Sequence, residues 1–64
     1  MCVYFISYVM KTANGSTTVG NSEVITGNEI THYEDVKMLQ EKLERQHGVM
    51  WVVITNFILL RKEL

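Results

Sequence analysis

The side chains of this 64-residue chain that could act chemically are one cysteine, two histidines and seven acidic residues. A reactive thiolate needs an electropositive and partly exposed setting, and no basic residue or helix start lies beside Cys2. We therefore expect Cys2 to be a small hydrophobic residue at the end of a strand, and not a nucleophile or redox thiol. A single cysteine also excludes an intrachain disulfide.

The two histidines could in principle serve as acid–base groups or as metal ligands. His32 and His47 stand far apart in the sequence and have no second cysteine to complete a zinc-binding pattern. We expect them at opposite ends of one helix, so they cannot act together within one chain. His47 is better explained as a cation placed near the negative end of that helix. We expect no metal site.

The acidic residues also fail to form a catalytic pattern. Glycosidase-type catalysis requires two carboxylates across a cleft, and a chain this short with a single helix has little room for one. Glu34 and Asp35 are better explained as favourable charges in the first turn of a helix. The segment "TANGSTTVGN" has two glycines but lacks the lysine and the strand–loop–helix context of a phosphate-binding loop. We therefore expect a binding protein with no cofactor, and not an enzyme.

Composition argues against nucleic acid as a partner. The formal net charge is -1, from 6 Lys and Arg against 7 Asp and Glu, whereas basic patches dominate affinity for nucleic acid. Tyr4, Tyr8 and Trp51 could stack on bases, but no cluster of basic residues surrounds them. A set of charged residues is expected on the outer face of the helix, either solvated or serving as a polar recognition surface: Lys37, Glu41, Lys42, Glu44 and Arg45.

The chain also lacks the patterns that direct proteins to membranes. No basic segment and cleavage site follow Met1, so we expect no signal peptide. The apolar run at residues 49–60 is shorter than the roughly 20 residues that a membrane-spanning helix needs, and its β-branched residues favour a strand. The expectation is a cytoplasmic protein without a membrane anchor.

The first half of the chain predicts a β-hairpin. Residues 3–12 and 16–26 are rich in β-branched and aromatic residues, and Asn14-Gly15 between them is typical of a two-residue type I′ turn. With this turn, Met10 would face Val19, Val9 would face Gly20, Ser7 would face Ser22 and Phe5 would face Val24. Gly20 indicates either a bulge or close backbone approach, or simply a weak point in an edge strand.

The second half predicts a helix and a third strand. Thr31 and Glu34 form a capping-box pattern before a helix over about residues 32–47, with Gly48 as its C-terminal stop and Glu41 and Arg45 able to pair. The apolar stripe of this helix contains Val36, Leu39 and Leu43, and Met38 lies off it. A strand over about residues 50–60 follows.

These elements predict one α+β domain over residues 1–64, with β-β-α-β order. The sheet would be three-stranded and antiparallel, with the first strand in the centre in the order 2-1-3. The helix would cover one face only, yet the first and third strands are apolar on both faces. On the third strand, simple alternation puts Met50, Val52, Ile54, Ile58 and Leu60 on one face.

A monomer of this kind would expose a large apolar face, so we expect a homodimer. The face carrying the tyrosines is chosen as the dimer or partner interface, because tyrosine combines apolar bulk with a polar tip and is enriched at interfaces. The alternative is that these tyrosines rim the monomer core. The predicted interface residues are Tyr4, Ile6, Tyr8, Met10, Trp51 and Phe57.

Four segments of the chain, "YFISYV", "VGNSEV", "T-x-x-E-D-V" and "WVVITNFILL", together resemble small β-β-α-β proteins of Gram-positive phages and prophages. The resemblance implies a non-catalytic accessory protein that binds a host protein in the bacterial cytoplasm and inhibits an antiphage defence system. An inhibitor of the Hachiman helicase–nuclease defence is the most specific match. The small net charge argues against a DNA mimic, so steric binding is expected. The alternatives are a phage assembly module that only self-associates and a small nucleic-acid-binding regulator.

Overall fold

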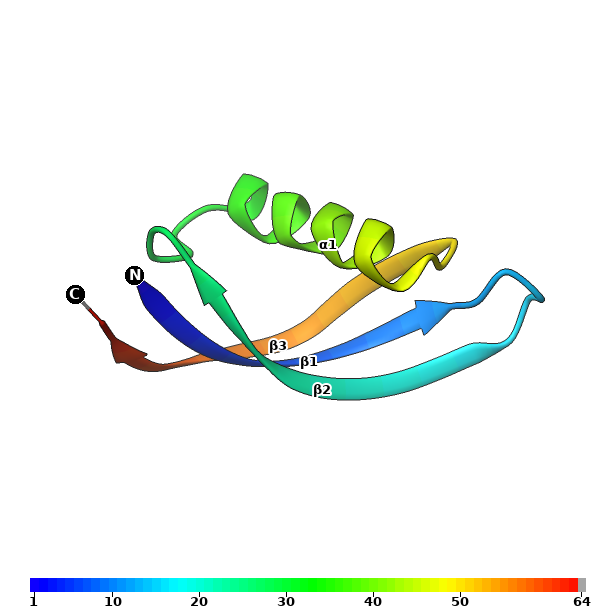
Figure 1. The fold of residues 1–64 in the computed structure, drawn as a ribbon, viewed down its shortest axis with the longest axis horizontal. Coiled ribbons are helices and arrows are strands. Elements are labelled where there is room, and N and C mark those ends of the chain that lie inside the picture. Colours follow the sequence, from blue (N-terminus) through cyan, green and yellow to red (C-terminus); the bar gives the residue numbers. More distant parts are fainter. Residues whose placement is uncertain (64) are drawn as a thin grey trace.

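Three antiparallel strands form one sheet, and a single helix packs on one of its faces (Figure 1). A computed structural model describes residues 1–63 of the chain. The strand order is β2-β1-β3, so the predicted α+β class, β-β-α-β order and central first strand are confirmed. The elements are β1 (Cys2–Lys11), β2 (Thr17–Thr26), α1 (Tyr33–His47) and β3 (Trp51–Lys62).

The turn between β1 and β2 differs from the predicted type I′ turn. The N–H of Thr12 donates to the Ser16 carbonyl at 2.8 Å, and the N–H of Gly15 donates to the Thr12 carbonyl at 2.9 Å. Of the turn residues, only Gly15 has a positive φ, at 89°. The Oδ1 of Asn14 accepts the N–H of Ser16 at 3.0 Å, and this side-chain bond favours a three-residue loop over a two-residue turn.

The longer loop moves the register of the hairpin by one residue. Phe5 pairs with Glu23, not Val24, and Tyr8 pairs with Gly20. The predicted register was therefore wrong, and each β2 residue lies on the opposite face from the one expected. No bulge occurs at Gly20. A Cβ atom there would lie 3.1 Å from the ring of Tyr8, so the close approach at this glycine is made by a side chain and not by backbone.

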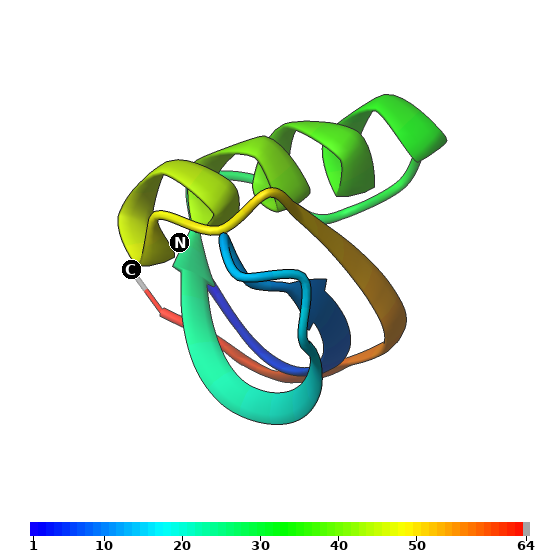
Figure 2. The same cartoon turned by 90° about the vertical axis from the view of Figure 1, so that its right-hand side faces the viewer.

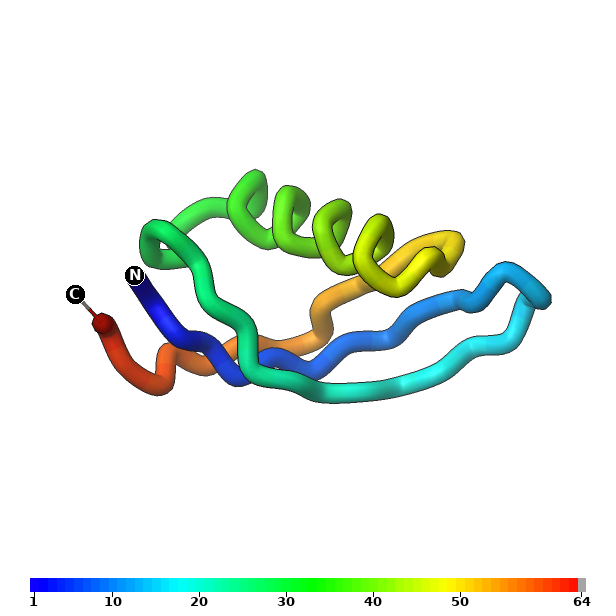
Figure 3. Tube along the Cα trace, viewed as in Figure 1, coloured from blue at the N-terminus to red at the C-terminus, as the bar shows by residue number. Residues whose placement is uncertain are grey.

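Strand β3 is not a regular partner of β1. Its register shifts twice, between Val3 and Tyr4 and between Ser7 and Tyr8 of β1, which leaves Leu60 and Thr55 of β3 without a β1 partner. The β3 trace bends sharply twice (Figure 3). Each bulge reverses the alternation of side chains beyond it. As a result Phe57 and Leu59 face the same side as Val52 and Ile54, and Ile58 faces the other, so the predicted grouping of β3 was wrong.

The helix begins one residue later than predicted. His32 is the N-cap, and the carboxylate of Asp35 accepts the N–H of Thr31 at 3.0 Å and that of His32 at 3.1 Å. The predicted box of Thr31 with Glu34 is therefore replaced by one centred on Asp35. The N–H of Thr31, and then that of His32, hold the pKa of Asp35 below its ordinary value.

Gly48, with φ of 64°, ends the helix and donates to the Glu44 carbonyl at 2.9 Å. The predicted C-terminal stop at Gly48 is confirmed. The predicted ion pair between Glu41 and Arg45 does not form within residues 1–63.

The hydrophobic core lies between α1 and the sheet. Leu39 and Leu43 are its buried helical residues, whereas Met38 is 68% exposed, as the predicted stripe requires. Cys2 is buried at the start of β1, which confirms its predicted role. The buried sheet residues of this core are Cys2, Tyr4, Ile6, Tyr8 and Val52.

Candidate functional site

The face of the sheet opposite α1 carries a row of apolar side chains with no element over it. Viewed along the strands, α1 lies above the sheet and nothing within residues 1–63 lies below it (Figure 2). Side chains alternate between faces along each strand, so the register assigns the residues of this surface. We name it the open face, and its apolar residues are Val3, Phe5, Val9, Val19, Ile25, Trp51, Val53 and Ile58.

Most of the open face is accessible to solvent. Val19 is 74% exposed, and Ile58 and Val53 are about half exposed at 51% and 48%. The exceptions lie on the central strand β1, where Val3 is fully buried and Val9 is partly buried. The accessible apolar side chains come from all three strands, so the open face is a property of the folded sheet and not of one segment.

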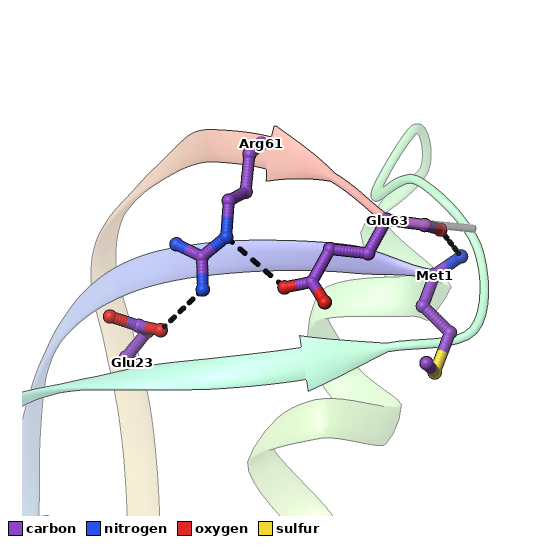
Figure 4. A network of polar contacts seen from close by, with 4 residues as sticks. All are labelled: Met1, Glu23, Arg61 and Glu63. Atoms are coloured by element: carbon purple, nitrogen blue, oxygen red, sulfur yellow. Dashed lines mark hydrogen bonds and ion pairs between the residues drawn. The ribbon is translucent and has the colours of Figure 1, made fainter.

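Charged side chains border the open face at one end. The guanidinium of Arg61 lies 3.3 Å from the carboxylate of Glu23 and 3.1 Å from that of Glu63, spanning β1 (Figure 4). The N-terminal amine of Met1 donates to the Glu63 carbonyl at 2.7 Å and closes the same end of the sheet. These ion pairs are exposed, and pairs of this kind contribute about 0–1 kcal/mol. They mark the end of the apolar surface and add little to the stability of the fold.

The predicted interface residues on β1 lie on the wrong face for that role. Tyr4, Ile6 and Tyr8 point toward α1 and are buried, and Met10 packs against the same core. The choice of the tyrosine side as the interface was therefore wrong, and the alternative of tyrosines at the rim of the monomer core comes closer, since Tyr4 and Tyr8 lie within that core. The reason is that the apolar stripe of α1 docks on that side.

The hydroxyl of Tyr4 has a hydrogen-bond partner within the fold, and the ring of Tyr8 packs inside it. The Oη of Tyr4 accepts the N–H of Ile30 at 2.8 Å, which ties the β2–α1 loop to the core. The ring of Tyr8 lies over Gly20, with the His47 ring 6.3 Å away between centroids. Both tyrosines therefore serve the monomer core.

The two predicted interface residues of β3 separate onto different faces. Trp51 lies on the open face and is 37% exposed. Phe57 lies on the α1 side, where its ring meets Tyr4 edge-on with centroids 6.0 Å apart. Of the six predicted residues, Trp51 alone belongs to the open face. The sequence prediction did not include Phe5 and Val53, which are the strongest further candidates on the open face. The apolar residues at the odd-numbered positions of β1 indicated that this face could be an interface.

Side chains of the helix form hydrogen bonds with one edge of the sheet, strand β3. On β3, the N–H of Val52 donates to Glu44 Oε2 at 2.9 Å and the N–H of Ile54 donates to Gln40 Oε1 at 2.8 Å. Glu44 therefore belongs to the helix–strand contact and not to the solvated outer face predicted for it. Further along, the N–H of Phe57 donates at 2.9 Å to the side-chain oxygen of its neighbour, Asn56.

A groove runs between α1 and β2, on the side that the helix leaves uncovered. It consists of two adjoining hollows of about 320 and 460 Å³ that share Ile25, Leu39 and Lys42 as lining residues. Arg45 lines one hollow, and His47 lines the other. The walls are therefore partly apolar and carry several basic side chains.

The residues considered for catalysis stay apart. Cys2 is buried, and His32 and His47 stand at opposite ends of α1. Within residues 1–63, no three His, Cys, Asp or Glu side chains gather closely enough to hold a metal ion. In the same range, α1 is too short and too polar to cross a membrane.

Comparisons of the chain with protein-family models, with curated proteins and with solved structures each find no match. The likeness to small phage proteins stays an expectation from the sequence. Two surfaces of the molecule remain as candidate sites: the open face, and the groove with the adjacent edge of β2.

Proposed function

We propose that this protein is a non-catalytic interaction module that forms a homodimer by packing the open faces of two copies against each other. The observation that carries the proposal is the exposure of apolar side chains from all three strands on the face opposite α1, on both sides of a polar row formed by Asn21, Ser7 and Asn56. Soluble monomers rarely expose contiguous apolar patches beyond a few hundred Å². A second copy is the simplest cover, because two-fold dimers are the commonest oligomers.

The size of the open face suits such an interface. The molecule measures 40 × 18 × 17 Å, so a rectangle that bounds its long side is about 700 Å² in area, of the same order as the roughly 800 Å² that each partner buries in a standard interface. Two sheets pack face to face at about 10 Å, a spacing that the side chains of Phe5 and Trp51 can fill. The dimer would also add a second core to a chain whose own core is small for stability.

The finer proposal concerns the partner. On the sequence resemblance, the dimer acts in the cytoplasm of a bacterial host and binds a host protein, sterically inhibiting an antiphage defence complex. The net charge of -1 favours this form over mimicry of DNA. A phage assembly module that only self-associates is the second candidate, and the same open face supports it. A nucleic-acid-binding regulator has weaker support, because no basic surface accompanies the aromatic residues.

Light scattering tests the dimer. We expect twice the mass of one chain at micromolar concentration, and the mass of one chain for V53K, because a lysine on the open face would be buried without a partner. Val53 is half exposed in the monomer, so V53K should keep its fold by circular dichroism. M38K, a matched change on the exposed side of α1, should remain a dimer. A monomeric wild type, or a dimeric V53K, would contradict the proposal.

Purification of a tagged chain from infected cells separates the candidate functions. A host protein recovered in stoichiometric amount supports inhibition, whereas phage particles alone support assembly. Recovery of nucleic acid alone would support the regulator and would argue against both leading candidates.

A further inference from the structure

The outer edge of β2 has no hydrogen-bonding partner within residues 1–63, because β2 is the terminal strand of the sheet. In an antiparallel pair, hydrogen-bonded and non-bonded positions alternate. The Thr12–Ser16 bond sets the phase, so the even-numbered residues of β2 bond to β1. The odd-numbered residues direct their N–H and C=O groups outward, namely Thr17, Val19, Asn21, Glu23 and Ile25.

This edge lacks the devices by which proteins block strand addition. Natural edges are protected by proline, lysine, bulges or a covering element. The ten residues of β2 contain no proline and no lysine, and their pairing with β1 has no register shift. On β3, by contrast, Gln40 and Glu44 of α1 occupy the edge N–H groups of Ile54 and Val52. The helix therefore closes part of one edge and leaves the other available.

Lys42 and Arg45 are cations in the groove beside the β2 edge, and its three carboxylates are already engaged elsewhere. Of its acidic lining residues, Glu29 pairs with Lys62, Glu23 pairs with Arg61, and Asp35 accepts two backbone N–H groups at the start of α1. Lys42 and Arg45 make no ion pair with any residue in the described part of the chain. The groove therefore offers free cations, while its anions are already engaged.

We infer that the β2 edge and the α1–β2 groove form a second binding site, which takes an extended segment of another protein by strand addition. The backbone of the segment bonds to the outward groups of β2, as in other cases of strand addition. On the side that faces α1, its side chains alternate between acidic groups near Lys42 and Arg45 and apolar groups over Leu39. This inference rests on the proposed binding role, but not on the dimer.

A second copy of this chain fits the groove less well. Strand β2 of another molecule would present to the groove the side chains that lie on the α1 side: Thr18, Ser22, Val24 and Thr26, together with Gly20. None of these is acidic, so Lys42 and Arg45 would remain unpaired. Charge complementarity therefore favours a foreign acidic segment.

The test uses a synthetic nonapeptide with Glu and Leu alternating on one face and Thr on the other, titrated into ¹⁵N-labelled full-length protein and followed by NMR. We expect shifts at β2 and along the groove side of α1. A matched peptide with Lys in place of Glu should bind at least about tenfold more weakly, because like charges would meet in the groove. Equal binding of both peptides, or no binding of the acidic peptide, would overturn the inference.

Two variants at Asn21 isolate the backbone contact. The Asn21 side chain is exposed and its N–H points outward, so N21P removes a donor needed by the added strand while keeping the bonds to β1. Loss of that bond should weaken binding about tenfold, and N21T, which keeps the N–H, should bind like the wild type. Unchanged binding of N21P would show that the peptide does not add as a strand.

Charge reversal and mass measurement complete the test. K42E/R45E should lose the preference for the acidic peptide, and a retained preference would contradict the role of these cations. V53K should bind the peptide as the wild type does, because Val53 lies on the open face. Peptide binding can therefore be interpreted even if the protein does not form the proposed dimer. If N21P alone halves the mass of the protein, the β2 edge pairs with a second copy and the inference is wrong.

Discussion

Next to the helix, the two faces of this sheet have similar side chains but opposite environments. On the α1 side, Ile6 and Val52 are almost completely buried. On the open face, Ile58 and Val53 of the same residue types are about half exposed. The difference arises because one amphipathic helix can cover one face only, and its buried residues Leu39 and Leu43 determine which face that is. Residue type therefore does not by itself indicate which face the helix covers.

The comparison also explains why tyrosine was a misleading guide to the interface. Tyr4 and Tyr8 are buried on the covered side, with the Tyr4 hydroxyl bonded to a loop N–H and the Tyr8 ring over a glycine. A polar tip that finds a partner inside the monomer makes tyrosine as suitable for a core as for an interface. The apolar side chains of the open face are instead mainly aliphatic, together with Phe5 and Trp51.

The largest expected difference between the two faces is in the free energy of unfolding on truncation of isoleucine. In the V53K background, which we expect to be monomeric, I6A should lower this free energy by about 2–5 kcal/mol, because it leaves a cavity in the core. I58A, on the open face, should lower it by less than roughly 1 kcal/mol. Urea denaturation measures the free energy of unfolding of both variants. If I6A does not fold, the milder I6V, with an expected loss of about 0.5–1.5 kcal/mol, replaces it in the comparison. Equal costs for I6A and I58A would contradict the assignment of the faces.

A smaller effect is expected where α1 bonds to the edge of β3. Q40L removes the acceptor for the Ile54 N–H and should cost about 1–2 kcal/mol, because a partly buried donor loses its partner. Q46L, a matched change at an exposed position of the same helix, should be nearly neutral. Denaturant melts of the two variants provide the measurement, and hydrogen exchange at Ile54 should accelerate in Q40L only. Similar melts would show that this bond does not hold the helix to the sheet.

The smallest expected effect is the acid dependence of the helix start. The pKa of Asp35 is lowered in the folded protein, so its contribution to stability is complete above the ordinary pKa of about 4 and is lost as the pH falls through the folded value. D35N should therefore be slightly less stable than the wild type near neutral pH, and the difference should shrink in acid. Thermal melts over that range test the sign, and a gap that grows in acid would contradict it.

Local patterns in the sequence were sufficient for the elements and their order. The hairpin followed from Asn14-Gly15 between two β-rich runs, and the helix followed from its apolar stripe and from Gly48, since these signals act between residues close in the chain. The order 2-1-3 also followed from connection rules. The excess of apolar side chains on β1 and β3 could be counted from the sequence alone, and it implied that one face of the sheet is uncovered.

Only the tertiary structure decided which side chains form that face. One extra residue in the β1–β2 loop moved the whole of β2, and the bulges at Thr55 and Leu60 reversed parts of β3. Because side chains alternate with a period of two, a change of one residue transfers every later side chain to the opposite face. The composition of the uncovered face depends on these single-residue shifts, and the groove beside β2 depends on where α1 docks.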